Sequence, residues 1–198
     1  MKKFLLLLVL LSVTTPFVNG QQAADSSAAP KPDSGSFIEN TYKSDFFGFS
    51  YLLPGEWQKS RAVGGPPPPG AYYLFIGDRH TGHPLMSRVI VIADAQSNYH
   101  SRLSAQQYVS TVIDRQIEHA HGDLIRLPSA FVVGGNHFER ADYKTVQDGV
   151  TLYKSMVCTD RNGYWLSWTF AAPSERELDD AVNTLQHVSF DRRSPRSR

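Results

Sequence analysis

FFGFSYLLPGEW occupies residues 46–57 and is crowded with aromatic side chains. Alternate positions of the stretch are apolar: Phe47, Phe49, Tyr51 and Leu53. That alternation is the period of a strand that turns one face toward a core. Pro54 then ends the strand together with Gly55, because proline has no backbone donor and the pair favours a turn. The stretch therefore predicts a first core strand, with Trp57 closing over its end.

Further strands are expected along the rest of the chain. Strand-like runs cover residues 71–78, 84–95, 130–146, 149–160 and 164–170. The run at 84–95 is apolar on both faces, which favours a central place in a sheet. Asn162 and Gly163 read as a hairpin turn before the last strand, whereas Gly134 and Gly135 indicate a bulge or a sharp bend.

Two helices are expected among these strands. The first opens with a capping box of Ser104 and Gln107, carries an apolar stripe at helical spacing, and stops at Gly122. The second opens with a capping box of Ser174 and Glu177. This order predicts an α+β fold, in which an antiparallel β-sheet is flanked by two main helices as an α-β-α sandwich.

Three stretches resemble the PsbP-like α-β-α sandwich family: YKSDFFGFSYLLPGEW at 42–57, FERADYKTVQDGVTLYKSMVCTDRNGYWLSWTFAA at 138–172, and SERELDDAVNTLQHVSF at 174–190. The family takes its name from the extrinsic lumenal subunit of photosystem II, and a Ran-binding nuclear import factor has a similar fold. The resemblance implies an accessory, binding or assembly role without catalysis. The metal sites of the photosystem subunit have no matching motif here, so the resemblance carries over no metal ligand.

The first residues have the pattern of a secretory signal peptide. Lys2 and Lys3 precede an apolar run over residues 4–13, and small residues lead to a cleavage site expected between Gly20 and Gln21. The alternative, a membrane anchor, needs about 20 apolar residues, and this run is shorter. We therefore expect a periplasmic or secreted protein, a distant bacterial member of the family, with no stable membrane span once the signal is removed.

The remaining chain divides by composition into a linker, one domain and a tail. The expected segments are a signal peptide at 1–20, a flexible linker at 21–41, a single PsbP-like domain at 42–190 and a basic disordered tail at 191–198. The linker is rich in small and polar residues and in proline, a composition that buries too little apolar surface to fold.

Charge argues against a nucleic-acid-binding protein. The formal net charge is +1. Basic residues gather at the two ends of the chain: Lys2, Lys3, Arg192, Arg193, Arg196 and Arg198. The domain between them is therefore mildly acidic, without the basic stripe that a nucleic-acid surface requires. The tail arginines either contact acidic lipid or another polyanion or are simply solvated, and we favour solvation.

A short loop offers the one sequence-local candidate for a metal site. Asp78, His80 and His83 lie within DRHTGH, and two histidines with a carboxylate are ligands that divalent metals accept. No third strong ligand follows in sequence, and a polar turn explains the same residues, which is the interpretation we favour. We expect no bound metal and no other cofactor.

Cys158 is the only cysteine and therefore forms no disulfide within the chain. A thiol nucleophile needs a lowered pKa from a helix N-terminus or a cationic neighbour, but this cysteine lies inside a predicted strand. A small packed residue is the favoured interpretation. The chain also contains no Gly-x-Ser-x-Gly elbow.

The run GGPPPPG at residues 64–70 is the last candidate, with Pro66, Pro67, Pro68 and Pro69 favouring a stiff polyproline II segment. It is either a partner-recognition element or a rigid loop. We expect a non-catalytic accessory or binding module for an unknown protein partner or small ligand. The alternative is a metal- or thiol-dependent extracytoplasmic enzyme that uses the 78–83 loop or Cys158.

Overall fold

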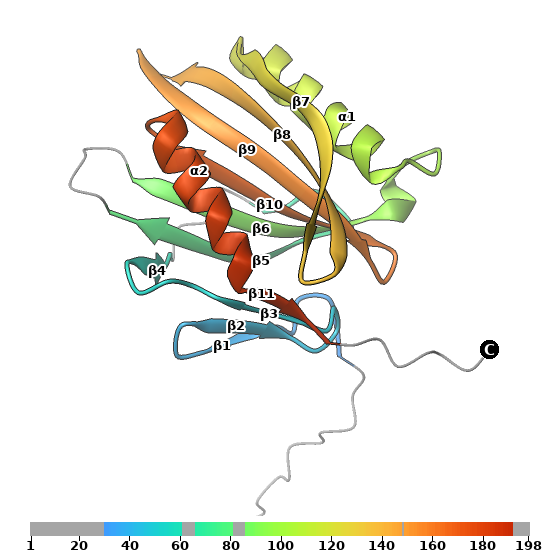
Figure 1. The fold of residues 1–198 in the computed structure, drawn as a ribbon. Coiled ribbons are helices and arrows are strands. Elements are labelled where there is room, and N and C mark those ends of the chain that lie inside the picture. Colours follow the sequence, from blue (N-terminus) through green and yellow to red (C-terminus); the bar gives the residue numbers. More distant parts are fainter. Residues whose placement is uncertain (1–29, 61–65, 81–85, 148, 192–198) are drawn as a thin grey trace, which may run out of the picture.

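The computed structural model describes residues 30–60, 66–80, 86–147 and 149–191 (Figure 1). The expected signal peptide and its cleavage site, His83, and the tail arginines lie outside these residues. Within the described ranges, no helix is both long enough and apolar enough to cross a lipid bilayer.

In the described part of the chain, seven antiparallel strands form the larger of two sheets (Figure 1). Their spatial order is β4-β5-β6-β10-β9-β8-β7. Their bounds are β4 Trp57–Lys59, β5 Ala71–Arg79, β6 Ser87–Ala95, β7 Asp123–Val133, β8 Asn136–Gln147, β9 Val150–Arg161 and β10 Tyr164–Ala172. Strand β6 pairs with β5 on one side and β10 on the other, which confirms its predicted internal place.

Positive backbone φ angles mark two of the hairpin turns in this sheet. Asn162 and Gly163 have φ of 51° and 82° and join β9 to β10, as predicted. Gly134 and Gly135 have φ of 55° and 78° and join β7 to β8. The second glycine pair is therefore a hairpin turn, where the sequence suggested a bulge or bend within a strand.

The stretch at 46–57 does not open the large sheet, which corrects the expectation of a single sheet. Among the described residues, four strands form a separate small sheet: β1 Ser36–Ile38, β2 Thr41–Ser44, β3 Phe49–Leu52 and β11 Val188–Phe190, in the order β1-β2-β3-β11. Strand β3 pairs with β11 from the far end of the domain, with Phe49 opposite Phe190. The Trp57 amide donates to the Pro54 carbonyl at 2.8 Å, so the chain turns there and enters the large sheet only at β4.

Strand β1 lies inside residues 21–41, the segment expected to be linker. It is ordered because it pairs in register with β2. Phe37 also contacts the rings of Tyr42 and Phe75, at centroid separations of 5.4 and 5.5 Å. The folded part of the chain therefore begins before Tyr42.

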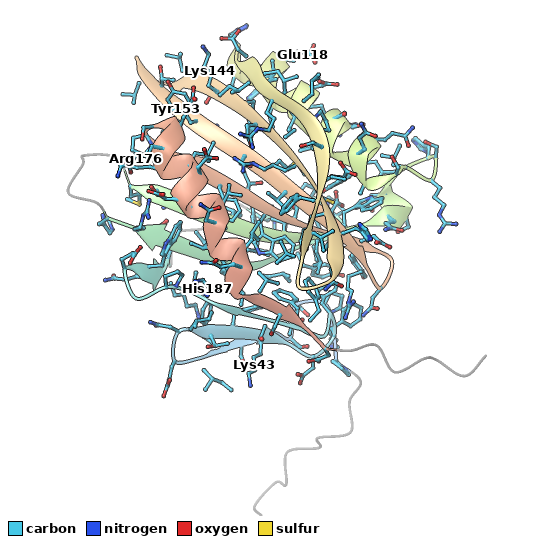
Figure 2. The ribbon with its side chains drawn as sticks, viewed as in Figure 1. Lys43, Glu118, Lys144, Tyr153, Arg176 and His187 are labelled. Atoms are coloured by element: carbon cyan, nitrogen blue, oxygen red, sulfur yellow. The ribbon has the colours of Figure 1, made fainter. Side chains whose placement is uncertain are left out.

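The main core fills the space between the small sheet, the large sheet and the second helix. The predicted alternation is confirmed there, since Phe47, Phe49, Tyr51 and Leu53 are each at most 3% exposed. Figure 2 shows side chains occupying this space, with Lys43 on the outer side of the small sheet and His187 near the end of the second helix.

Helix α1 spans Ala105–Ala120 and begins with the predicted capping box. Ser104 accepts from the Gln107 amide at 3.2 Å, while the Gln107 side chain accepts from the Ser104 amide at 2.8 Å. The left-handed residue that ends the helix is His121, with φ of 49°, and not Gly122. Glycine is required at position 122 for a steric reason, because a Cβ there would clash with the Lys144 carbonyl oxygen at 2.3 Å.

Helix α2 spans Glu175–Asn183 and is capped by Ser174, which accepts from the Glu177 amide at 3.2 Å. It packs on β6, β9 and β10, on the same face of the large sheet as the small sheet. Helix α1 packs on the opposite face, over β7, β8 and β9. The α+β prediction is confirmed, but α1 covers only half of its face and the small sheet shares the other face with α2.

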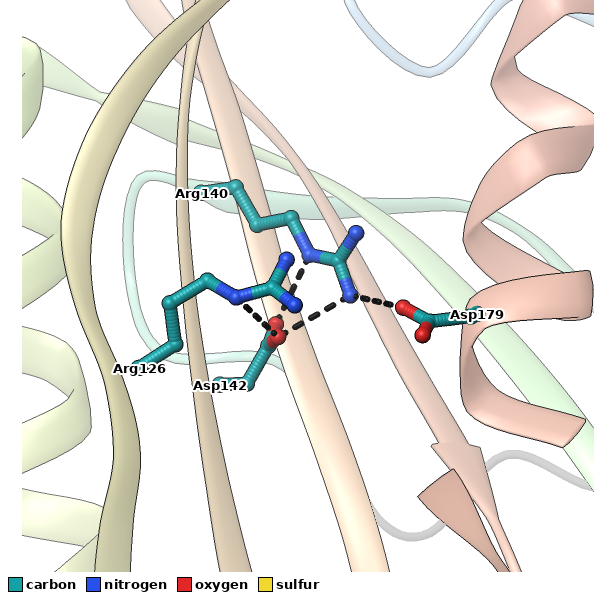
Figure 3. A network of polar contacts seen from close by, with 4 residues as sticks. All are labelled: Arg126, Arg140, Asp142 and Asp179. Atoms are coloured by element: carbon teal, nitrogen blue, oxygen red, sulfur yellow. Dashed lines mark hydrogen bonds and ion pairs between the residues drawn. The ribbon is translucent and has the colours of Figure 1, made fainter. Parts of the chain in front are cut away.

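A charged cluster joins α2 to the large sheet (Figure 3). Arg140 on β8 donates to both oxygens of Asp142 at 2.8 and 2.9 Å and to Asp179 on α2 at 2.7 Å. Arg126 on β7 adds a second contact to Asp142 at 3.2 Å. Because the carboxylate of Asp142 is 4% exposed and held by two guanidinium groups, we interpret this cluster as structural.

Candidate functional site

A groove of about 1020 Å³ occupies the half of the large sheet that α1 leaves uncovered. Strand β6 shows how the sheet builds its floor. Side chains on one face of this strand are buried in the main core, namely Val89, Val91 and Ala93. Those on the other face are partly exposed and line the groove, namely Arg88, Ile90, Ile92 and Asp94.

The middle of the floor is mainly apolar. Register across β5, β6, β10 and β9 places two rows side by side: Tyr73, Ile92 and Ser167 in one, and Ile90, Thr169 and Met156 in the other. Leu103 and Val112 add apolar surface from the α1 side. A pocket of this size, with an apolar middle and polar groups around it, is typical of small-molecule binding sites.

One end of the groove is closed by hydrogen bonds around Asp94. Its carboxylate accepts from the Asn98 amide at 2.9 Å and from the hydroxyl groups of Tyr99 and Tyr108. Burial and the Asp94 charge raise the pKa of both tyrosines, so both hydroxyls stay protonated. Asp94 therefore already accepts three hydrogen bonds at this end.

At the other end, Asp78, one of the candidate metal ligands in the sequence, forms an ion pair with Arg88. Arg88 donates to both oxygens of Asp78 at 2.7 and 3.1 Å. Although burial opposes ionisation, hydrogen bonds from Arg88 and Ser60 hold the pKa of Asp78 below its ordinary value. His80 is exposed, and His83 lies outside the described residues. No cluster of three His, Cys, Asp or Glu side chains suited to a metal ion occurs in the described ranges.

Lys154 extends this end of the floor from β9. It lies opposite Ala171 on β10 and Tyr143 on β8, and its ammonium is 5.8 Å from the centroid of the Tyr143 ring. The side chain is half-buried, and burial lowers its pKa. No carboxylate among the described residues forms an ion pair with it, in contrast to Arg88.

Cys158 is fully buried between the large sheet and α1. Burial raises the pKa of its thiol well above the ordinary value, and the nearby carboxylates of Asp160, Glu139 and Asp94 raise it further. The thiol is therefore protonated and sealed from solvent, the opposite of a reactive cysteine. Cys158 and the described part of the 78–83 loop, residues 78–80, therefore give no support to the alternative enzyme.

The proline run ends at the groove. Pro68 and Pro69 line one edge of it, while Pro66 is exposed. Their backbone is held in place, because the Pro68 carbonyl accepts from the Ala71 amide at 3.0 Å and the Pro69 carbonyl accepts from Asn98 at 3.0 Å. Pro67 is half-buried. The run is thus anchored as a rim beside the groove.

The sequence reasoning missed most of this site. The two apolar faces of β6 were a usable signal, but we interpreted the second face only as evidence of an internal strand. The sequence around Lys154 does not indicate a binding residue, because lysine is common in strands and its neighbours in space cannot be read from the sequence.

No protein-family profile matches this chain, and no curated protein sequence matches it at a significant level. Cyanobacterial PsbP (CyanoP) from Synechocystis sp. PCC 6803 is similar in structure, with a TM-score of 0.53 at 16% identity, over 76% of this chain and 91% of that one. LpqN, involved in cell envelope biogenesis of Mycobacterium tuberculosis, has a TM-score of 0.44 at 11% identity over 73% and 83% of the two chains. A Pseudomonas aeruginosa protein of unknown function has a TM-score of 0.43 at 16% identity, over 73% and 92%. The similarity to CyanoP shows the PsbP-like fold that the three sequence stretches predicted.

Proposed function

We propose that this chain, a distant PsbP-like protein by fold, is an extracytoplasmic, non-catalytic binding module that holds a small amphiphilic molecule in the groove beside α1. The observation that carries the proposal is the groove itself. Its apolar middle lies between two polar ends, in the one half of the α1 face that no described helix covers.

Binding without conversion fits the chemistry of the lining. Asp78 is neutralised by Arg88, Asp94 is occupied by three donors, and the Cys158 thiol is buried. A general base or nucleophile needs an accessible lone pair near the substrate, and ion pairing, hydrogen bonding or burial restricts that access in each of these groups. The resemblance to PsbP-like proteins, which implies an accessory role, supports the same conclusion.

An extracytoplasmic location is supported by the first residues of the sequence. Lys2 and Lys3, followed by a short apolar run and small residues, are typical of an exported protein. The segments that we propose around the domain are those predicted above: a cleaved signal at 1–20, a linker after it, and a basic tail at 191–198. The proline run at Pro66–Pro69 belongs to the same proposal, because its Pro68 and Pro69 line one edge of the groove and would limit which ligands enter.

The test is to block the groove and measure binding. Thr169 is half-exposed at the centre of the floor, so Thr169→Trp places an indole in the ligand space and not in the packed core. The matched control is Thr151→Trp, a half-exposed threonine one strand away, whose side chain lies on the opposite face of the sheet. Binding of single-chain amphiphiles with anionic, neutral and cationic head groups is measured by calorimetry.

We expect the wild type and Thr151→Trp to bind at least one amphiphile, and Thr169→Trp to lose that binding at an unchanged melting temperature. Mass spectrometry of the recovered ligand should show no chemical change. Equal binding by Thr169→Trp and the wild type would place the ligand elsewhere, and a converted ligand would overturn the non-catalytic proposal.

A further inference from the structure

We propose that Lys154 is the anion-binding residue of the groove, and that the ligand is a single-chain amphiphile whose anionic head group lies against this lysine. The inference rests on the proposed function, because it specifies which molecule the groove holds and in which direction.

The charges along the floor give the groove a polarity. Asp94 marks one end, where its carboxylate already accepts from three donors. Arg88 and Lys154 mark the other end, six residues away along β6, which corresponds to about 20 Å. Arg88 is neutralised by Asp78. Arg115 adds a cation from the α1 side, and Lys154 is the cation of the sheet floor for which the described residues supply no ion-pair partner.

The surroundings of Lys154 leave its positive charge without a hydrogen-bond acceptor from the described residues. Its ammonium has three donors, yet it has no hydrogen-bond acceptor among the described residues. The ring of Tyr143 attracts the charge at 5.8 Å without accepting those hydrogen bonds. A half-buried cation without an acceptor is unfavourable. An anionic oxygen entering the groove would supply the missing acceptor in a site that excludes part of the solvent.

The apolar part of the floor determines which tail the ligand can have. From the row of Arg88 and Lys154, the next two rows are built on Ile90 and Ile92. They extend the floor by four residues, or about 13 Å of mostly apolar surface. An alkyl chain fits this surface, whereas a compact polar metabolite would leave it exposed. Charge at one end and apolar surface beyond it together describe an anionic amphiphile with its head at Lys154.

The experiment compares decanoate with decan-1-ol and with decyltrimethylammonium, three probes that share a chain and differ in the charge of the head. Wild type, Lys154→Gln, Lys154→Arg and the control Lys144→Gln are titrated calorimetrically at neutral pH. Lys144 lies on the opposite face of the same sheet, where its ammonium is 3.5 Å from Asp123 (Figure 2).

We expect the wild type to bind decanoate roughly tenfold or more tightly than decan-1-ol, as a charge-assisted hydrogen bond implies. Lys154→Gln should lose this preference but keep the weaker binding of decan-1-ol, while Lys154→Arg and Lys144→Gln should keep the preference. Higher salt should weaken decanoate binding and leave decan-1-ol binding unchanged.

Two results would overturn the inference and are distinguishable from each other. If the wild type binds all three probes equally and Thr169→Trp abolishes that binding, the groove binds amphiphiles but Lys154 does not choose the head group. If the wild type binds none of the three probes, both this inference and the proposed function are refuted. The wild-type comparison decides between these cases even if Lys154→Gln does not fold.

Discussion

Replacing Phe49 with alanine should be among the most damaging single changes in the small sheet. Phe49 lies in β3, is 3% exposed, and points into the core between the two sheets. Its ring is 5.8 Å from the ring of Trp168 in the large sheet and 5.9 Å from that of Phe190 in β11. It therefore joins the first strands of the domain to both the central sheet and the chain end.

The magnitude follows from the buried ring. Removing it withdraws roughly 150 Å² of apolar contact, which corresponds to about 4 kcal/mol at 25 cal/mol per Å². Measured losses for Phe→Ala in protein cores are about 3–5 kcal/mol, and the edge-to-face contact with Trp168 favours the upper part of that range. The melting temperature of a domain of this size should fall by roughly 10 °C.

Urea unfolding followed by tryptophan fluorescence measures this loss, and Leu52→Ala is the matched control. Leu52 is the last residue of β3, lies on the face opposite the alternating residues and is 46% exposed, so its loss should stay below about 1 kcal/mol. The slope of the unfolding free energy against urea should be unchanged in both variants. Equal destabilisation by the two substitutions would show that the alternation in residues 46–57 does not decide which side chains stabilise the domain.

Three further outcomes are expected. Asp142→Asn should lower the free energy of unfolding by about 3 kcal/mol, since Arg140 and Arg126 would lose the buried carboxylate between them; a loss below about 0.5 kcal/mol in urea unfolding would contradict the structural interpretation. Because the pKa of Asp78 is lower in the folded state, its stabilisation is complete above the ordinary aspartate pKa of about 3.9 and is lost as pH falls through the folded value. Asp78→Asn should therefore lose less stability than the wild type between neutral and strongly acidic pH, and parallel pH profiles would refute this. Cys158 should react slowly with a thiol reagent in the native protein and quickly in denaturant, whereas fast native labelling would restore the thiol-enzyme alternative.

Local patterns in the sequence were sufficient for the separate elements of the fold. The alternation from Phe47 to Leu53 predicted the buried face of a strand, and the structure buries all four of its apolar residues. Ser104 predicted the start of α1, because capping requires only the residues of the first turn. Asn162 and Gly163 predicted the β9–β10 turn, since adjacent positive φ angles favour those residue types. Each of these features is set by neighbours within a few positions.

Relations between distant segments were decided only by tertiary structure. Strand β3 lies in a second sheet because β11, from the other end of the domain, pairs with it, and no local signal in residues 46–57 selects that partner. Lys154 is a groove residue because α1 packs over β7 to β9 and leaves β5 and β6 open. The sequence alone determined that β6 has two apolar faces. Which face is buried in the core and which forms the floor of the groove depends on where α1, α2 and the small sheet pack against the large sheet. Those contacts join segments that are distant in sequence, so only the tertiary structure decides them.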